Sequence, residues 1–182
     1  MQVLNIHERE IPVTAREVAG LLNSLSSEND ALWPRTMWPP MRLDGPLGVG
    51  ASGGHGPVRY AVEEFSPGQM VTFRFSGPRG FDGIHRFEVL PRGENRAVLR
   101  HTIDMKIRGP ELLSWPLVFR PLHDALLEDS LALAQANLGA IPDVRAWSPW
   151  VRFLRWVFSS GKAPGQRVPD PAVNRIRAKG RA

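Results

Sequence analysis

Residues 58–107 read VRYAVEEFSPGQMVTFRFSGPRGFDGIHRFEVLPRGENRAVLRHTIDMKI, and this stretch decides the fold. Four segments in it, 58–65, 69–75, 84–90 and 96–107, alternate apolar and polar residues with the period of two of a half-buried β-strand. Short turns rich in glycine and proline separate the segments. Connections of hairpin length join antiparallel neighbours, so we predict an antiparallel sheet with one dry face and one wet face.

The residues before these strands are expected to form a further strand and a short helix. Residues 3–11 predict a strand, after which Thr14 and Glu17 have the spacing of a capping box that begins a helix. Residues 30–33 have the pattern of another short helical turn. Residues 34–57 are rich in proline and glycine and predict a long loop, which in compact domains is often a binding lid.

A long helix is expected after the strands, from about Pro110 to Gly139. Pro116 and Pro121 must bend or interrupt its first part, and Gly139 is well placed to end it. From residue 120 onward one stripe is largely apolar, and four polar side chains are expected outside it: Asp124, Glu128, Asp129 and Gln135. Strands followed by a helix predict an α+β fold in which the helix covers one face of the sheet.

The composition describes an ordinary globular chain without thiols. Its 182 residues are enough for one domain with a substantial core and an extension. The absence of cysteine excludes disulfides, thiolate metal sites and a cysteine nucleophile. The N-terminal segment lacks the order of a signal peptide, and no apolar stretch reaches the roughly 18 residues that span a bilayer. A cytoplasmic location is therefore the default expectation.

The net charge of +5 is distributed unevenly along the chain. Residues 140–182 contain nine Arg or Lys and two Asp residues, which gives +7 and leaves about −2 for residues 1–139. A basic extension on a near-neutral body indicates an anionic surface as its partner and argues against a nucleic-acid-binding fold. We divide the chain into a domain of residues 1–140 and a basic, Trp-rich extension of residues 141–182, expected to be partly helical and then disordered.

In four segments the chain resembles the SRPBCC superfamily, also called START-like or Bet v 1-like helix-grip proteins. The segments are GHGPVRYAVEEFSPGQMVTFRF, GFDGIHRFEVLP, LRHTIDM and WPLVFRPLHDALLEDSL. The resemblance covers about residues 3–139 and implies a helix-grip fold, in which a curved sheet wraps around the C-terminal helix and encloses an internal cavity. It leaves the activity open, because this fold carries lipid carriers, polyketide cyclases, aromatases, hormone receptors and co-chaperones.

Three histidines lie on the apolar side of their own predicted elements. His85 and His101 alternate with the apolar residues of their strands, and His123 lies on the apolar stripe of the long helix. A buried imidazole without a hydrogen-bond partner costs about 1–3 kcal/mol, so these rings are expected to pair with each other, with water or with a ligand. The alternative is a solid core. The predicted ligand-binding set is His85, His101, His123, Tyr60, Phe73, Phe75, Phe87, Met105, Leu126, Leu127 and Ser130.

These histidines do not predict a metal site, because no pair of ligands has the short spacing typical of metal-binding helices or turns. No cofactor is expected. The same three residues are the candidate catalytic groups of an enzyme, since histidine is the natural acid–base group near neutral pH. No acidic partner is expected on the inward face, because Glu88 and Asp104 are predicted to point outward.

The extension contains an aromatic and basic segment that predicts a helix beginning at Pro149. Trp, Phe and Leu beside Arg are typical of a helix that lies in a membrane interface. The predicted membrane contacts are Trp147, Trp150, Phe153, Leu154, Trp156, Arg152 and Arg155, with further attraction to anionic lipid from Lys162, Arg167, Arg175, Arg177, Lys179 and Arg181. The alternatives are that this segment packs back on the domain or closes a homodimer.

Three functional hypotheses follow from these observations. The leading one is a binding or transport protein for a hydrophobic small molecule, such as a lipid or a polyketide-like compound, located in the cytoplasm and peripheral at a membrane. The second is an enzyme of cyclase, aromatase or dehydratase type that uses the cavity histidines as acid and base. The third is an interaction module that acts through the basic aromatic extension.

Overall fold

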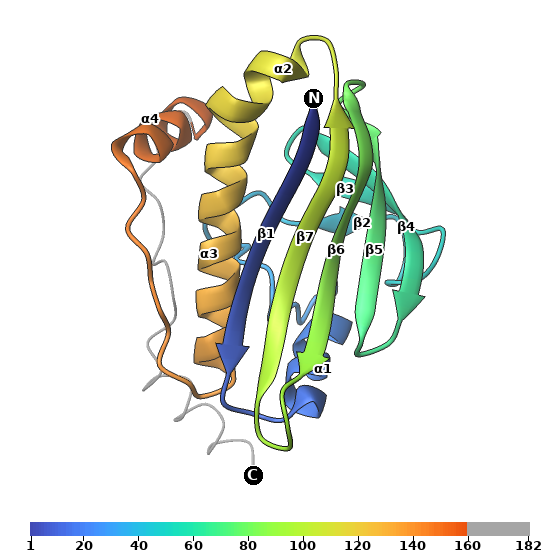
Figure 1. Ribbon diagram of the computed structural model, residues 1–182, viewed down its shortest axis with the longest axis vertical. Coiled ribbons are helices and arrows are strands. Elements are labelled where there is room, and N and C mark those ends of the chain that lie inside the picture. The colour runs from blue at the N-terminus through green and yellow to red at the C-terminus, as the bar shows by residue number, and fades with distance from the viewer. Residues whose placement is uncertain (160–182) are drawn as a thin grey trace.

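Seven strands form one antiparallel sheet in the order β1-β7-β6-β5-β4-β3-β2 (Figure 1). The structure is a computed structural model, and it describes residues 1–159. The elements are β1 (Gln2–Ile11), α1 (Ala15–Ser24), β2 (Arg42–Leu43), β3 (Ser52–His55), β4 (Val58–Ser66), β5 (Met70–Gly77), β6 (Phe81–Pro91), β7 (Ala97–Ile107), α2 (Glu111–Ser114), η1 (Trp115–Phe119), α3 (Arg120–Asn137) and α4 (Pro149–Phe158).

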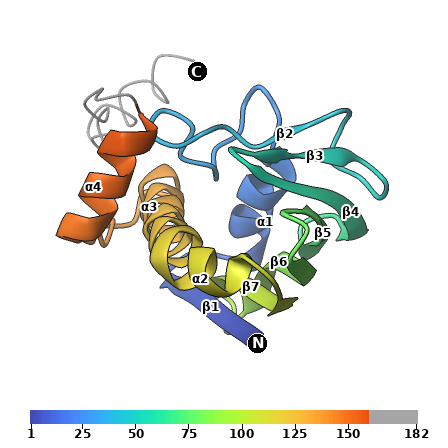
Figure 2. The same cartoon turned by 90° about the horizontal axis from the view of Figure 1, so that it is seen from above.

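The sheet curves, and the long helix α3 lies along its concave side (Figure 2). Seen from above, the strands form an arc, with α3 on its open side and α1 inside it. This is the α+β helix-grip architecture that the resemblance implied. The four alternating segments correspond to β4, β5, β6 and β7, and their expected inward side chains are buried or half-buried.

Local signals in the sequence determine where the helices begin and end. Thr14 and Glu17 form the expected capping box at the start of α1. After α3, the amide of Ala140 donates to the carbonyl oxygen of Gln135 at 2.9 Å, which is the long bond of a Schellman motif. Gly139 has a φ of +76°, a left-handed conformation that favours glycine.

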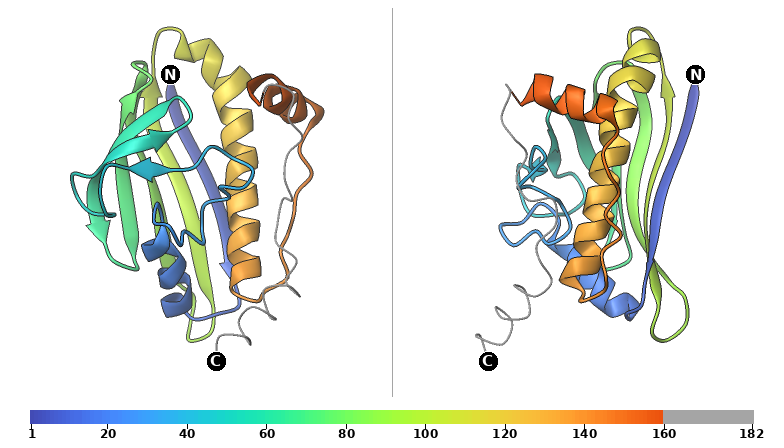
Figure 3. Two further views of the ribbon diagram at one scale, coloured as in Figure 1. Left: turned by 180° about the vertical axis from the view of Figure 1, so that it is seen from behind. Right: turned by 90° about the vertical axis from the view of Figure 1, so that its left-hand side faces the viewer.

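The predicted interruption of the long helix is present as η1, a π-helical turn between α2 and α3. Pro121 has no N–H to donate to the carbonyl of Leu117, four residues earlier. That oxygen accepts the indole N–H of Trp150 at 2.7 Å. The break therefore provides an attachment point for α4, which lies on the outer side of α3 near η1 (Figure 3).

Residues 30–57 differ from the expectation in two ways. Residues 30–33 form bends and no helical turn, because Asp30 Oδ1 accepts the backbone amides of Leu32 and Trp33 at 2.9 and 2.8 Å. The predicted long loop contains β2 and β3. Residues 33–57, named the cover segment below, also bury the apolar side chains of Trp33, Met37, Trp38 and Met41.

The polar residues expected outside the stripe of α3 are not all in solvent. Asp129 is 1% exposed, because its Oδ2 accepts the indole N–H groups of Trp38 and Trp147 at 2.9 and 3.0 Å. Gln135 is buried as well. Asp124 and Glu128 are half-buried and face β1. Asp129 and Gln135 are buried although they were predicted outside the stripe, because partners outside the helix satisfy them.

Candidate functional site

A cavity of about 480 Å³ lies among the concave face of the sheet, α3, η1, the cover segment and α4. The buried apolar side chains form two clusters, a large one that includes α1 and a small one around Phe81 and Trp115. Cavity-lining residues come from both clusters. The volume falls within the range of small-molecule sites, which is roughly 300–1,000 Å³.

Six of the eleven predicted ligand-binding residues line this cavity, and five do not. Those that line it include all three predicted histidines. The lining residues of the predicted set are Phe75, His85, His101, His123, Leu126 and Leu127. Tyr60, Phe73, Phe87, Met105 and Ser130 are buried but lie outside the lining.

Three of the five form a layer behind the imidazoles. Phe73 stacks on His85 with the ring centroids 4.8 Å apart. Phe87 contacts His101 edge to face at 4.5 Å, and Tyr60 contacts His85 in the same way at 4.6 Å. These rings therefore fix the orientation of the histidines and do not themselves form the wall.

The other two have structural roles outside the lining of the cavity. Met105 belongs to the small apolar cluster. Ser130 donates its hydroxyl to the carbonyl oxygen of Leu32 at 2.9 Å, which ties α3 to the segment just before the cover segment. The inward position of these residues was predicted, whereas packing decides whether they border the cavity.

His85 and His101 form a hydrogen-bonded pair. His85 Nδ1 and His101 Nε2 lie 3.3 Å apart, and the side chains are 4% and 2% exposed. Burial lowers the pKa of both rings well below the usual value, and the neighbouring histidines lower the pKa further. Both rings are therefore neutral near pH 7. Within residues 1–159, nothing bonds to His85 Nε2 or His101 Nδ1.

His55, which is not among the predicted site residues, also lines the cavity. Its Nδ1 lies 3.0 Å from the hydroxyl of Tyr60, and its ring lies 4.8 Å from that of Trp33. Burial lowers the pKa of His55 to about 3, with smaller contributions from His123 and Arg59. Its position in a Gly-rich stretch gave no periodic pattern from which its direction could be predicted.

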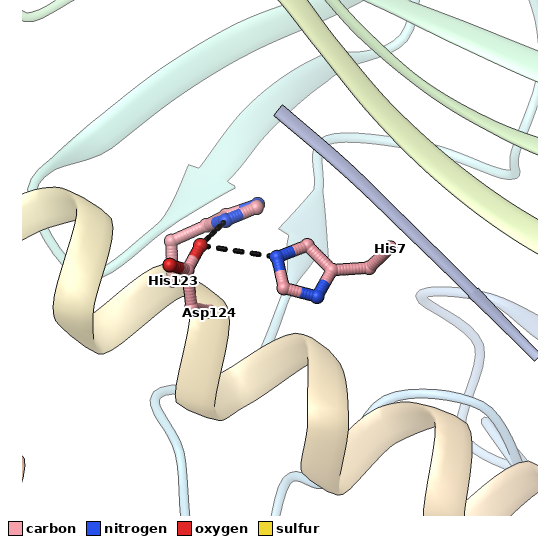
Figure 4. Close-up of side chains that lie close together, drawn as sticks. All are labelled: His7, His123 and Asp124. Carbon is pink, nitrogen blue, oxygen red and sulfur yellow. Dashed lines mark hydrogen bonds and ion pairs between the residues drawn. The ribbon is translucent and has the colours of Figure 1, made fainter. Parts of the chain in front are cut away.

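His7 completes the group, so that all five histidines of the chain lie at or beside the cavity. His7 Nε2 lies 3.0 Å from Asp124 Oδ1 (Figure 4). His7 Nδ1 lies 2.9 Å from Glu128 Oε1. Burial lowers the pKa of His7, but the two carboxylates outweigh this effect, so the pKa is raised. The sequence did contain a signal for His7. It lies an even number of residues from Val3 and Ile11, which are buried near the two ends of β1, so its side chain is on the same face of the strand.

His123 lies next to this ion pair and corrects the prediction that no acid accompanies the cavity histidines. His123 Nδ1 is 3.6 Å from Asp124 Oδ1 (Figure 4). Burial lowers the pKa of His123, and the contact with Asp124 opposes that shift. Burial would raise the pKa of Asp124, but its close contacts with His123 and His7 hold the pKa well below its usual value.

The rest of the wall is apolar and aromatic, and much of it was not predicted. Trp33 and Trp38 come from the cover segment, and Phe158 comes from α4. Sheet and helix residues that were not in the predicted set are Val58, Phe81, Ile103, Trp115, Val118, Phe119 and Leu122. Arg155 of α4 also lines the cavity, with its guanidinium 4.4 Å from the ring centroid of Trp38.

Helix α4 begins at Pro149 as predicted, but it packs on α3. Three of the predicted membrane contacts face the protein: Leu154 is buried, Trp147 donates to Asp129, and Arg155 donates to the carbonyl oxygen of Met37. Four remain exposed, namely Trp150, Arg152, Phe153 and Trp156. The more distal basic residues, from Lys162 to Arg181, and the predicted disorder lie outside the described residues. None of the described helices combines the length and apolar character needed to cross a bilayer.

Comparisons with known proteins identify the fold. No protein-family model matches the chain, and no curated protein matches it either. Norcoclaurine synthase from Thalictrum flavum matches with a TM-score of 0.56 and 15% identity over 76% of this chain and 87% of that one.

Two bacterial structures are similar to the same extent. A Thermobifida fusca protein has a TM-score of 0.60 and 16% identity over 78% of this chain and 99% of that one. CalU16 from Micromonospora echinospora has a TM-score of 0.54 and 12% identity over 88% of this chain and 96% of that one. At 12–16% identity these matches show the fold alone, and they confirm the Bet v 1-like helix-grip fold expected from the resemblance.

Proposed function

We propose that this protein binds a hydrophobic small molecule that carries a neutral polar group, such as a hydroxyl or a ketone. The observation that carries the proposal is the neutral His85–His101 pair in the wall of an otherwise mainly apolar cavity. Norcoclaurine synthase, which shares the fold, was solved in complex with dopamine and hydroxybenzaldehyde. The cavity here is large enough for one molecule of such a size class.

The hydrogen-bonding capacity of the pair favours a neutral ligand group. Each neutral imidazole has one N–H and one acceptor nitrogen. The bond between the rings uses one N–H and one acceptor, so one donor and one acceptor remain whichever tautomer is present. The remaining atoms are His85 Nε2 and His101 Nδ1, which are both buried, so the rings would have to turn slightly for a ligand to reach them. A hydroxyl group can satisfy either of them, and a carbonyl oxygen can satisfy the donor.

Matched probes test this proposal without knowledge of the natural ligand. 2-Naphthol and naphthalene differ by one hydroxyl group, and their binding can be followed through tryptophan fluorescence. One buried hydrogen bond contributes about 1 kcal/mol, so 2-naphthol is expected to bind roughly fivefold more tightly than naphthalene. The double variant His85→Phe/His101→Leu should remove that preference, because only the apolar part of the interaction remains.

A matched control is Leu4→Ser, on the exposed outer side of β1, where the leucine is 65% exposed. This variant should bind both probes as the wild type does. Failure of both probes to bind the wild type would overturn the proposal of a ligand cavity. Equal affinities of the two probes in the wild type would overturn the proposed role of the histidines.

A second candidate is an enzyme that moves protons within the cavity, and the contact between His123 and Asp124 favours it. A carboxylate beside an imidazole orients the ring and stabilises its protonated form during proton transfer. The cyclase, aromatase or dehydratase hypothesis would use this pair as the acid–base group. The decisive measurement is turnover with a candidate polyketone, and a bell-shaped pH–rate profile that Asp124→Asn abolishes would favour this candidate over simple binding.

For the partner, we propose that the exposed face of α4 contacts an anionic membrane surface. Trp150, Phe153 and Trp156 are 44%, 49% and 61% exposed, and their rings follow one another at 5.4 and 6.4 Å. Exposed leucines of α2 and η1 extend the patch, since Trp150 donates to the carbonyl oxygen of Leu117. The basic sequence of residues 140–182 supports an anionic partner.

Liposome flotation tests the membrane proposal. The protein should float with vesicles of phosphatidylserine and phosphatidylcholine and not with phosphatidylcholine alone. The double variant Phe153→Ser/Trp156→Ser should lose flotation, whereas Leu4→Ser/Ile6→Ser, an exposed apolar pair on β1, should keep it. If instead the α4 variant dissociates a dimer in sedimentation experiments and leaves flotation unchanged, the face is a homodimer interface.

A further inference from the structure

We propose that His7, His123 and Asp124 form a binding site for a divalent transition-metal ion, with zinc as the best fit. The three side chains come from β1 and α3 and converge beside the cavity (Figure 4). Their ligand atoms lie within 4.8 Å of one another, and this is the one such group of three among residues 1–159. The inference does not depend on the proposed hydrophobic ligand.

The spacing of the ligand atoms suits a small metal ion. Two atoms that are each about 2.0–2.1 Å from a tetrahedral zinc ion lie roughly 3.3 Å from each other. Asp124 Oδ1 lies 3.0 Å from His7 Nε2 and 3.6 Å from His123 Nδ1. A cation can therefore take the place of the proton between His7 and Asp124 with shifts of a few tenths of an ångström at those two contacts.

The residue types point to zinc or a similar ion and away from calcium or magnesium. Two imidazoles and one carboxylate are borderline nitrogen and oxygen ligands, whereas calcium and magnesium prefer oxygen alone. Both ring nitrogens of His123 are buried and lack a hydrogen-bond partner within residues 1–159. Coordination through Nδ1 would satisfy one of them, and this unmet capacity is the second observation in favour of a site.

The surrounding residues have the arrangement that orients metal ligands. A metal-binding histidine usually donates its other N–H to a carboxylate, and His7 Nδ1 lies 2.9 Å from Glu128 Oε1. Arg9 in turn holds Glu128 Oε2 at 2.7 Å. Asn5 Nδ2 donates to Asp124 Oδ1 at 3.0 Å. These contacts direct His7 Nε2 toward the carboxylate.

Three protein ligands leave at least one coordination position for water or for a ligand atom, as in zinc sites that keep an open position. His123 also lines the cavity. The metal would therefore lie one side chain away from the cavity interior and would tie β1 to α3. This link connects the edge of the sheet to the helix that it grips.

The test uses full-length protein without an affinity tag, stripped with EDTA and titrated with zinc chloride in a calorimeter. We expect one site per chain with a Kd below about 10 μM, and a visible absorption band of tetrahedral type when cobalt replaces zinc. Asp124→Asn and His7→Gln should each weaken binding at least 100-fold. Glu128→Gln should weaken it about tenfold, because the effect of an orienting residue is smaller.

His55→Gln is the matched control, because it removes a cavity histidine outside the proposed ligand set. It should bind zinc as the wild type does. Circular dichroism and thermal melting establish that each variant is folded, and the nearly isosteric Asp124→Asn serves if His7→Gln does not fold. Zinc binding weaker than about 100 μM in the wild type, or wild-type binding by a folded Asp124→Asn variant, would overturn the proposal.

Discussion

The two ends of the space between the sheet and α3 differ, although the same strands form both. At one end α1 packs against β6 and β7, and the space is filled by apolar side chains such as Leu22, Leu99 and Leu131, all 1% exposed or less. Figure 1 shows α1 at one end of the sheet. At the other end His85, His101 and His123 line a cavity of about 480 Å³.

This difference shows how one fold separates stability from a candidate binding function. The filled end has apolar groups in close contact and accounts for most of the hydrophobic stabilisation. Within residues 1–159, the hollow end keeps buried polar atoms without partners, which lowers stability and leaves hydrogen-bonding capacity for a ligand. Substitutions at the filled end should therefore lower the free energy of unfolding, whereas substitutions at the hollow end should change ligand binding. The predictions below are ordered by their expected effect on the free energy of unfolding.

The largest effect is expected from Leu131→Ala at the filled end. Leu131 is fully buried on α3, and a leucine-to-alanine change in such a position lowers the free energy of unfolding by about 2–5 kcal/mol. Urea denaturation followed by circular dichroism measures the loss. The preference for 2-naphthol over naphthalene should survive in the folded variant, and its disappearance would mean that the two ends are not separable.

The next effect is a loss of stability at acid pH in metal-free protein. The pKa values of buried His85 and His101 are lowered, so the unfolded chain binds more protons than the folded chain below pH 6.5. Their stabilising contribution is complete above pH 6.5 and is lost as the pH falls, by up to about 1.4 kcal/mol per pH unit for each ring. His7 acts in the opposite direction, because its pKa is raised.

Urea denaturation between pH 5 and pH 7.5, with EDTA present, measures this slope. The double variant His85→Phe/His101→Leu provides the comparison, since it removes both rings from the titration. Its free energy of unfolding should fall less steeply with decreasing pH than that of the wild type. Equal slopes would indicate that these two rings are not buried in the neutral form.

A smaller effect is expected from Thr14→Ala at the start of α1. The Thr14 side chain accepts the amide of Glu17 and is part of the capping box, so its loss should lower the free energy of unfolding by about 1 kcal/mol. Thermal melting measures the change. Because α1 lies at the filled end, probe binding should remain at the wild-type level, and a change in probe affinity would link the cap to the cavity.

The smallest effect on stability at neutral pH is expected from the same double variant, His85→Phe/His101→Leu. Replacing both members of a buried polar pair with apolar groups of similar shape is close to neutral, so the change should stay within about 1 kcal/mol. Binding should nevertheless lose its preference for the hydroxyl of 2-naphthol. A loss of several kcal/mol would mean that the pair holds the fold together.

Much of the fold was predictable from the sequence because local patterns agree with it. The alternation in β6 and β7 identified His85 and His101 as inward residues, and the stripe of α3 did the same for His123. His7 was not identified, because β1 carries exposed apolar residues, Leu4 and Ile6, on the opposite side from its inward polar residues. The inward polar residues of β1 are stable there because Asp124 and Glu128 of α3 face the strand and pair with His7.

The cover segment and α4 were the least predictable parts of the candidate site. Their contacts with the domain join residues far apart in the chain, such as Trp38 with Asp129, and Arg155 with the carbonyl oxygen of Met37. No periodic pattern encodes contacts of this kind. The sequence therefore indicated an amphipathic helix after Pro149 without showing which of its side chains face the cavity.

The sequence by itself determined the strands, the helix ends and the inward direction of three histidines, because these depend on periodicity, caps and turns among neighbouring residues. Only the tertiary structure decided which inward residues border a hollow, since that depends on where α1 ends and how large the facing side chains are. It also decided that His7 and Asp124 meet beside His123, because side chains 117 positions apart come into contact only when the sheet closes on the helix.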